Sequence, residues 1–145
     1  MGITIFASGN IADINDIQPL IADIKEIAAG HGWNYHIVCD DFGSVPTGKL
    51  TRDLEARGAK IEGSLGLKGI IIETGDGAEP FSILVDRCGV LTDMLQQVAW
   101  IESRGTSGRF TSCKTQFANI ESHIRFIEVL DLLKRKYIPG LVVND

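Results

Sequence analysis

The chain is short of cysteine and of positive charge, and each shortage excludes a class of protein. Its three cysteines, Cys39, Cys88 and Cys113, are an odd number with no close pair, which indicates reduced thiols and not a secreted disulfide framework. The formal net charge is −5, so the chain lacks the excess of lysine and arginine on which nucleic-acid affinity depends. We therefore expect a cytoplasmic protein that does not bind nucleic acid.

Long apolar runs are also missing. The longest is far too short to cross a bilayer, and no basic residue precedes the apolar run near the start, so we expect neither a signal peptide nor membrane association. The chain does have 145 residues of which 44% are hydrophobic, enough for a core without disulfides or a structural metal. We predict one domain over residues 1–145. The strand-like ending at 141–143 is compatible with the N-terminal part of a longer protein.

Short β-rich runs between Lys68 and Asp93 carry the main signal for the fold. They are joined by turns too tight to contain a crossover helix, and residues 75–77 and 86–89 supply glycine and aspartate for chain reversal. This pattern predicts an antiparallel meander. Further strands are expected at 3–7, 33–40, 59–65 and 110–117, and those of the meander at 68–74, 81–86 and 90–92. Residues 94–102 fit either a helix or a strand.

Two longer helices are predicted from apolar spacing. The first follows Asp16 as N-cap, closes at Gly30 and carries its apolar stripe on Ile17, Ile21, Ile24 and Ala28. The second begins after Asn119 and stops before Pro139. Its expected apolar stripe consists of Phe117, Ile120, Ile124, Ile127, Leu130, Leu133 and Tyr137.

These elements predict an α+β fold. We expect a two-layer sandwich, a mainly antiparallel twisted sheet in the order β-α-β, then a β-meander, then α, with the two long helices on one face. Ile71 alternates with Ile70 and Ile72, so both faces of the central strands are apolar. Something should cover the second face: the irregular segment 41–58, a partner subunit or a ligand. A short helix at 51–57 is expected within that segment.

Residues 43–49 fit the pattern G-x-x-x-x-G-K of a phosphate-binding loop and follow a strand. Leu50 stands where such a loop needs Ser or Thr for magnesium, and Pro46 removes one amide from the phosphate cradle. Nucleotide binding here is therefore a remote alternative. His31, His36 and Cys39 match no known metal-site spacing, so neither a metal nor a cofactor is predicted.

The strand-to-helix junction at 112–123 is the best candidate site. Lys114 and Gln116 share one face of the expected strand, and His123 lies in the first turns of the helix that follows. With Arg109, and with segment 41–58 as a lid, they could bind a small anionic ligand. The competing interpretation is a capped helix after a polar strand, with Cys113 a small core residue and not a nucleophile. No catalytic residue is identified.

Two functional hypotheses follow. The first is a non-catalytic interaction module that forms a homo-oligomer, such as a homodimer, or binds a protein partner over the apolar second sheet face. The second is a small-molecule binding domain or modest enzyme with its site at the junction 112–123. A substitution of Lys114 by alanine separates them, because only the second predicts a loss of ligand stabilisation.

Overall fold

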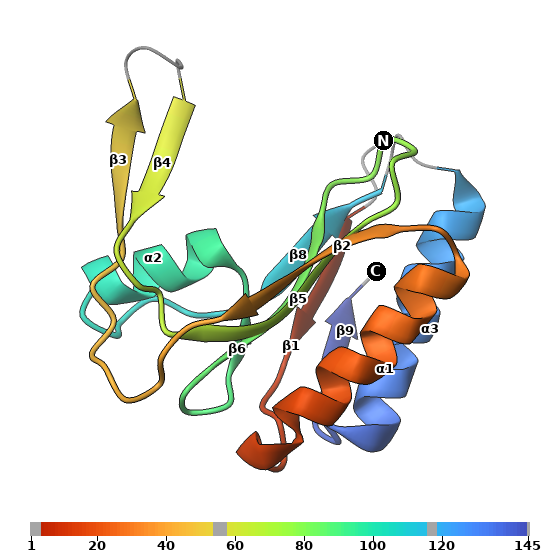
Figure 1. Cartoon of the computed structure of the whole chain (residues 1–145), viewed down its shortest axis with the longest axis horizontal. Helices are drawn as coiled ribbons and strands as arrows, with labels where there is room; N and C mark the ends of the chain where they lie inside the picture. The colour runs from red at the N-terminus through yellow and green to blue at the C-terminus, as the bar shows by residue number, and fades with distance from the viewer. Residues whose placement is uncertain (1–3, 54–57, 116–118, 145) are drawn as a thin grey trace.

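The computed structural model describes residues 4–53, 58–115 and 119–144, and Figure 1 shows its course. The helices are the 3-10 turn η1 (Ile14–Asp16), α1 (Ile17–Gly30), α2 (Met94–Glu102) and α3 (Ile120–Lys136). The strands are β1 (Thr4–Ser8), β2 (Asn34–Cys39), β3 (Lys49–Asp53), β4 (Gly58–Glu62), β5 (Leu67–Glu73), β6 (Phe81–Asp86), β7 (Leu91–Thr92), β8 (Thr111–Lys114) and β9 (Val142–Asn144).

The strands form two larger antiparallel sheets and one separate hairpin. The first sheet has the order β2-β5-β6-β7 and the second the order β8-β1-β9. The two are joined where Asn10 bridges Val90 and where the Leu91 amide donates to the Gly9 carbonyl at 2.9 Å. Strands β5, β6 and β7 follow one another through connections too short to contain a crossover helix, as predicted for the meander. The prediction of an α+β fold is confirmed.

The two long helices lie next to each other on one side of the sheets (Figure 1). Beneath them is the larger hydrophobic cluster, here called the first core. Ile17, Ile21, Ile24 and Ala28 of α1 are all buried in it, so the predicted stripe of the first helix is confirmed. Asp16 does stand at the start of α1, but its side chain makes no capping hydrogen bond.

The first turns of α3 bury a different face from the one expected from spacing. Ile120 is 77% and Ile124 is 48% exposed, whereas Ser122 and Phe126 are buried. The start of the helix sets this rotation, because the Asn119 side chain caps the Ser122 amide at 2.9 Å and the Ser122 hydroxyl binds a carboxylate of the β5–β6 turn. Further along, Leu130, Leu133 and Tyr137 of the expected stripe are buried, together with Val129, and Phe117 lies outside the described residues.

Helix α2 covers part of the second face of the β2-β5-β6-β7 sheet. Asp93 caps it by accepting the Gln96 amide at 2.8 Å, and Val98 packs with Leu67 and Leu84 in a smaller cluster, here called the second core. A ligand, a partner subunit and segment 41–58 were the expected covers. The structure instead assigns this part of the face to an element of the same chain that spacing left undecided between helix and strand.

Strands β3 and β4 form an arm that projects from the body beside α2 (Figure 1). Residues 51–53 belong to β3 and pair in register with 58–60, so the expected short helix at 51–57 is wrong for its described residues, and 54–57 lie outside them. Ile61 at the base of the arm packs against the second core. Among the helices that the structure describes, none has the length and apolarity needed to cross a membrane.

Candidate functional site

The predicted junction links the end of β8 to the start of α3. The Lys114 amide donates to a Glu79 carboxylate oxygen at 3.1 Å, and the Lys114 carbonyl accepts the Glu79 amide at 3.0 Å. The Thr115 hydroxyl lies 2.7 Å from Nδ1 of His123. Lys114 and His123 therefore flank the junction as expected, with Thr115 as a partner that spacing did not identify. Gln116 lies outside the described residues.

Arg109 lies at the opposite end of β8 from Lys114. The strand between them, Thr111–Lys114, is about 10 Å long at ~3.3 Å per residue. The Arg109 guanidinium forms an ion pair with the buried Asp86 and lies 4.1 Å from the Trp100 ring centroid. The structure thus places Arg109 in a contact between α2 and the β6–β7 turn and away from Lys114 and His123.

Cys113 packs in the first core. Its thiol donates to the Glu79 carbonyl at 3.2 Å. Burial above all, with the nearby charges of Glu79 and Asp76, raises the pKa of this thiol to about 12. Since the thiolate is the nucleophilic form, Cys113 is a core residue, as expected from its strand face.

Asp76 occupies the N-terminal end of α3. It accepts the hydroxyls of Thr74 and Ser122, each at 2.5 Å. Burial would raise the pKa of Asp76, but these hydroxyls and the backbone amides of Ala78 and Asn119 together hold it below its ordinary value. A carboxylate of the protein therefore already occupies the helix end where an anionic ligand would gain most from the helix dipole.

A polar cleft of about 230 Å³ opens beside Asp76. It is lined by His31, Trp33, Thr74, Asp76, Asn119, Glu121, Ser122 and Arg125. Segment 112–123 contributes Asn119, Glu121 and Ser122 to it, while His31 and Trp33 come from the turn between α1 and β2. No spacing rule connects that turn to the start of α3, so sequence reasoning could not find this cleft.

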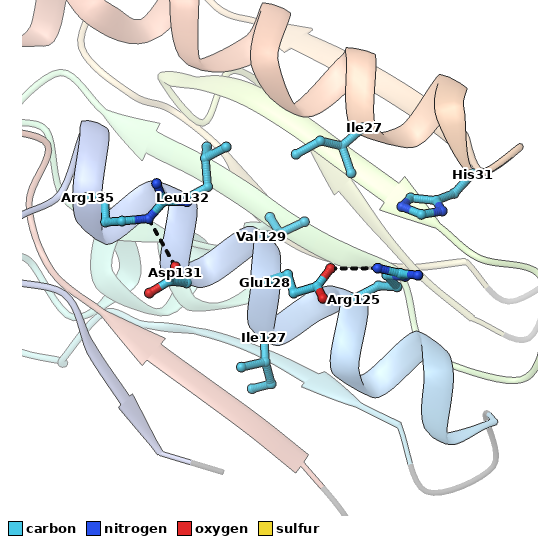
Figure 2. A pocket seen from close by; sticks show the side chains of 9 residues that line it. All are labelled: Ile27, His31, Arg125, Ile127, Glu128, Val129, Asp131, Leu132 and Arg135. Atoms are coloured by element: carbon cyan, nitrogen blue, oxygen red, sulfur yellow. Dashed lines mark hydrogen bonds and ion pairs between the residues drawn. The ribbon is translucent and has the colours of Figure 1, made fainter.

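A larger groove of about 580 Å³ runs between α1 and α3 (Figure 2). Ile27 of α1 and His31 of the turn after α1 project into it, opposite Leu132 of α3. Its charged groups are already paired within α3. Arg125 binds Glu128 at 2.9 Å, and Arg135 binds Asp131 at 3.0 Å. The groove is thus apolar inside, and the charged side chains at its edge are paired with one another.

The G-x-x-x-x-G-K segment does not form a phosphate cradle. Its amides are used internally, because Gly43 donates to Asp41 Oδ1 at 2.8 Å, and Thr47 and Gly48 donate to the Ser64 carbonyl at 2.9 and 2.8 Å. Lys49 then begins strand β3, whereas a phosphate-binding loop leads into a helix whose N-terminus faces the phosphates. The geometry does not fit a nucleotide at 43–49.

The outer edge of β2 is an open sheet edge. In the part of the chain that the structure describes, β2 pairs only with β5. The Asp40 amide donates to the Leu67 carbonyl at 2.9 Å, and hydrogen-bonded positions alternate along an antiparallel strand. The backbone groups of Tyr35, Ile37 and Cys39 therefore point away from β5 and toward solvent.

The side chains of this edge are apolar and partly exposed. Tyr35 is 40% and Ile37 is 42% exposed, on the face of the sheet that α1 covers further inside. Natural edge strands are commonly protected by lysine, proline or a bulge. Strand β2, with the sequence NYHIVC, has no lysine, proline or acidic residue, and it pairs with β5 in continuous register.

Comparison with protein-family models, with curated proteins and with solved structures gives no match. Within the described residues, no group of three or more His, Cys, Asp or Glu side chains is arranged to hold a metal ion.

Proposed function

We propose that this chain is a non-catalytic interaction module that forms a homodimer by pairing β2 with β2 of a second copy. The observation that carries the proposal is the open β2 edge with its two partly exposed apolar side chains. A free row of backbone donors and acceptors is a template for strand addition. Part of the second sheet face, expected to associate, is covered by α2, which packs against Val38, Leu67 and Leu84, and this makes the edge the better surface.

If the two-fold axis of the dimer passes through Ile37, every outward-pointing residue of β2 pairs with an outward-pointing residue of the second copy. Ile37 then faces its own copy, and Tyr35 faces Cys39 of the partner subunit in both directions. Each of these pairs exchanges two backbone hydrogen bonds, about six in all, each contributing roughly 1 kcal/mol net. No like charges meet in this register, since the strand carries neither acidic residues nor lysine.

The substitution of Ile37 by lysine tests the pairing. It places two ammonium groups opposite each other across the axis, so we expect the dimer dissociation constant to rise at least tenfold in analytical ultracentrifugation. Ile124→Lys is the matched control, because Ile124 is 48% exposed but lies on α3. A wild-type protein that stays monomeric at high concentration, or a dimer that Ile37→Lys leaves intact, would contradict the proposal.

A cysteine at position 37 tests the register. In a background with Cys39 and Cys88 changed to serine, Ile37→Cys brings two thiols together at the axis. Opposite Cα atoms of a hydrogen-bonded pair lie about 5.5 Å apart, which a disulfide can span. We expect a covalent dimer on mild oxidation.

Native mass spectrometry of the purified wild-type protein separates the two functional classes. A dimer without extra mass supports self-association. A monomer that carries a discrete extra mass would instead favour a small ligand in the polar cleft at the start of α3.

A further inference from the structure

Strand pairing alone provides a small interface. Stable interfaces bury roughly 1,600 Å² in total and use about 20–30 residues from each partner. Strand β2 supplies six residues. Surface continuous with the β2 edge must therefore contribute if the proposed dimer is stable.

The turn that follows β2 presents an unusually exposed apolar side chain. Val45 is 72% exposed. On the N-terminal side of Val45, the Asp41 carboxylate accepts hydrogen bonds from the Gly43 amide and the Ser44 hydroxyl, each at 2.8 Å. On its C-terminal side, the amides of residues 47 and 48 donate to the Ser64 carbonyl. Val45 is therefore held out from the body by an ordered turn.

Antiparallel pairing determines what lies opposite this turn. With the axis at Ile37, the C-terminal end of each β2 lies beside the N-terminal end of the other. Asp40 then faces Asn34 of the partner subunit, and Asp41 faces Trp33 of the partner subunit. The turn thus begins opposite the partner's segment between α1 and β2.

That segment offers an aromatic surface. The rings of His31 and Trp33 stack with their centroids 4.9 Å apart, His31 is exposed and Trp33 is partly buried. A branched aliphatic side chain packs well against such a pair of rings, and aromatic residues dominate the energetics of protein interfaces.

We propose that the turn 41–46 clasps the second copy, with Val45 packed on the stacked rings of His31 and Trp33 of the partner subunit. This inference rests on the proposed β2 pairing. It assigns the rest of the interface to two equivalent contacts, one at each end of the paired strands. In each contact, Val45 of one protomer packs on the rings of the other.

Val45→Glu is the main test. We expect it to raise the dimer dissociation constant about tenfold in analytical ultracentrifugation and to leave the thermal midpoint of the monomer unchanged, because the side chain makes little contact with its own chain. Val142→Glu is the matched control, since Val142 is 55% exposed and lies on β9, and we expect no change in affinity.

Thiol cross-linking gives an independent readout. In the background with Cys39 and Cys88 changed to serine, the pair Val45→Cys and His31→Cys should form a doubly cross-linked dimer, while each single variant should not. The same pair at positions 142 and 31 should remain monomeric on a denaturing gel.

The outcomes separate the two proposals. If Ile37→Lys disrupts the dimer but Val45→Glu and the cross-linking pair have no effect, the clasp is wrong and the β2 dimer stands. If Ile37→Lys has no effect, or if the wild type is a monomer, both the pairing and the clasp are wrong. A weakened Val45→Glu dimer together with the 45–31 cross-link supports both.

Discussion

The two faces of the β2-β5-β6-β7 sheet are covered very differently. Under α1 and α3, the first core contains large, fully buried side chains, including Phe81 and Phe126, whose ring centroids lie 5.2 Å apart. Under α2, the second core has five buried apolar residues and borders the fully buried Gln97. The Gln97 side-chain nitrogen donates to the Leu65 carbonyl at 3.0 Å, but its oxygen has no hydrogen-bond partner among the residues that the structure describes.

The two clusters therefore differ in polar content as well as in size. A buried polar atom without a hydrogen-bond partner costs about 1–3 kcal/mol. The burial of the few apolar side chains in the second core has to offset this cost. The first core therefore supplies most of the stability. The second core joins α2 and the base of the arm to the body, and it does so with polar as well as apolar contacts.

The largest expected effect comes from removing a side chain of each core in turn. We expect Phe126→Ala to lower the free energy of unfolding by about 4 kcal/mol, because the ring is fully enclosed and leaves a cavity. Leu84→Ala should cost about 2.5 kcal/mol, since α2 can move toward the sheet and close part of the cavity. Urea denaturation measures both. A Leu84 variant that is as damaging as the Phe126 variant would remove the distinction between the cores.

The next largest effect should come from Arg109, which connects α2 to the sheet. Asp86 is 3% exposed and accepts the amides of Cys88 and Val90 as well as the Arg109 guanidinium. Arg109→Ala would leave that buried carboxylate without its cation, at a cost of about 3 kcal/mol in urea denaturation. Arg87→Ala is the matched control at an exposed neighbour, with an expected change within about 0.5 kcal/mol.

The same variant bears on the site predicted from sequence. If Arg109 bound a ligand, its loss would remove ligand stabilisation and leave the unfolding of the free protein unchanged. A stable Arg109→Ala protein would therefore contradict the structural role that the ion pair indicates. Asp86→Asn in the Arg109→Ala background should recover part of the lost stability, because it removes the unpaired charge.

Local signals predicted most of the fold. The tight turns identified the meander, four apolar positions identified the buried face of α1, and Asn119 marked the start of α3. The buried face of α3 was predicted incorrectly at Ile120 and Ile124 because a tertiary contact sets its first turn. That contact joins Ser122 to Asp76, 46 residues apart.

The candidate site was less predictable than the fold. Lys114 and His123 do flank one junction, since both are close to it in sequence. Arg109 is only five residues before Lys114, but strand β8 separates the two residues. The Arg109 side chain contacts Asp86 and Trp100 at the other end of that strand. The open β2 edge depends on which strands pair, and no property of the residues 34–39 alone shows that they stand at the end of the sheet order.

The smallest expected effect is a pH-dependent contribution from Asp76, which ties the meander to α3 on the first-core side. The pKa of Asp76 is lowered in the folded protein, so its ionised form stabilises the fold above about pH 4, and this contribution is lost as the pH falls through the lowered value. We expect Asp76→Asn to cost about 1 kcal/mol at pH 7, after allowance for solvent screening, and progressively less as the pH falls through the lowered pKa of Asp76. Unfolding of both proteins measured from pH 7 to pH 2 tests this, with Ser122→Ala as partner in a double-mutant cycle. A difference between the two proteins that stays constant with pH would show that Asp76 acts through its shape and not through its charge.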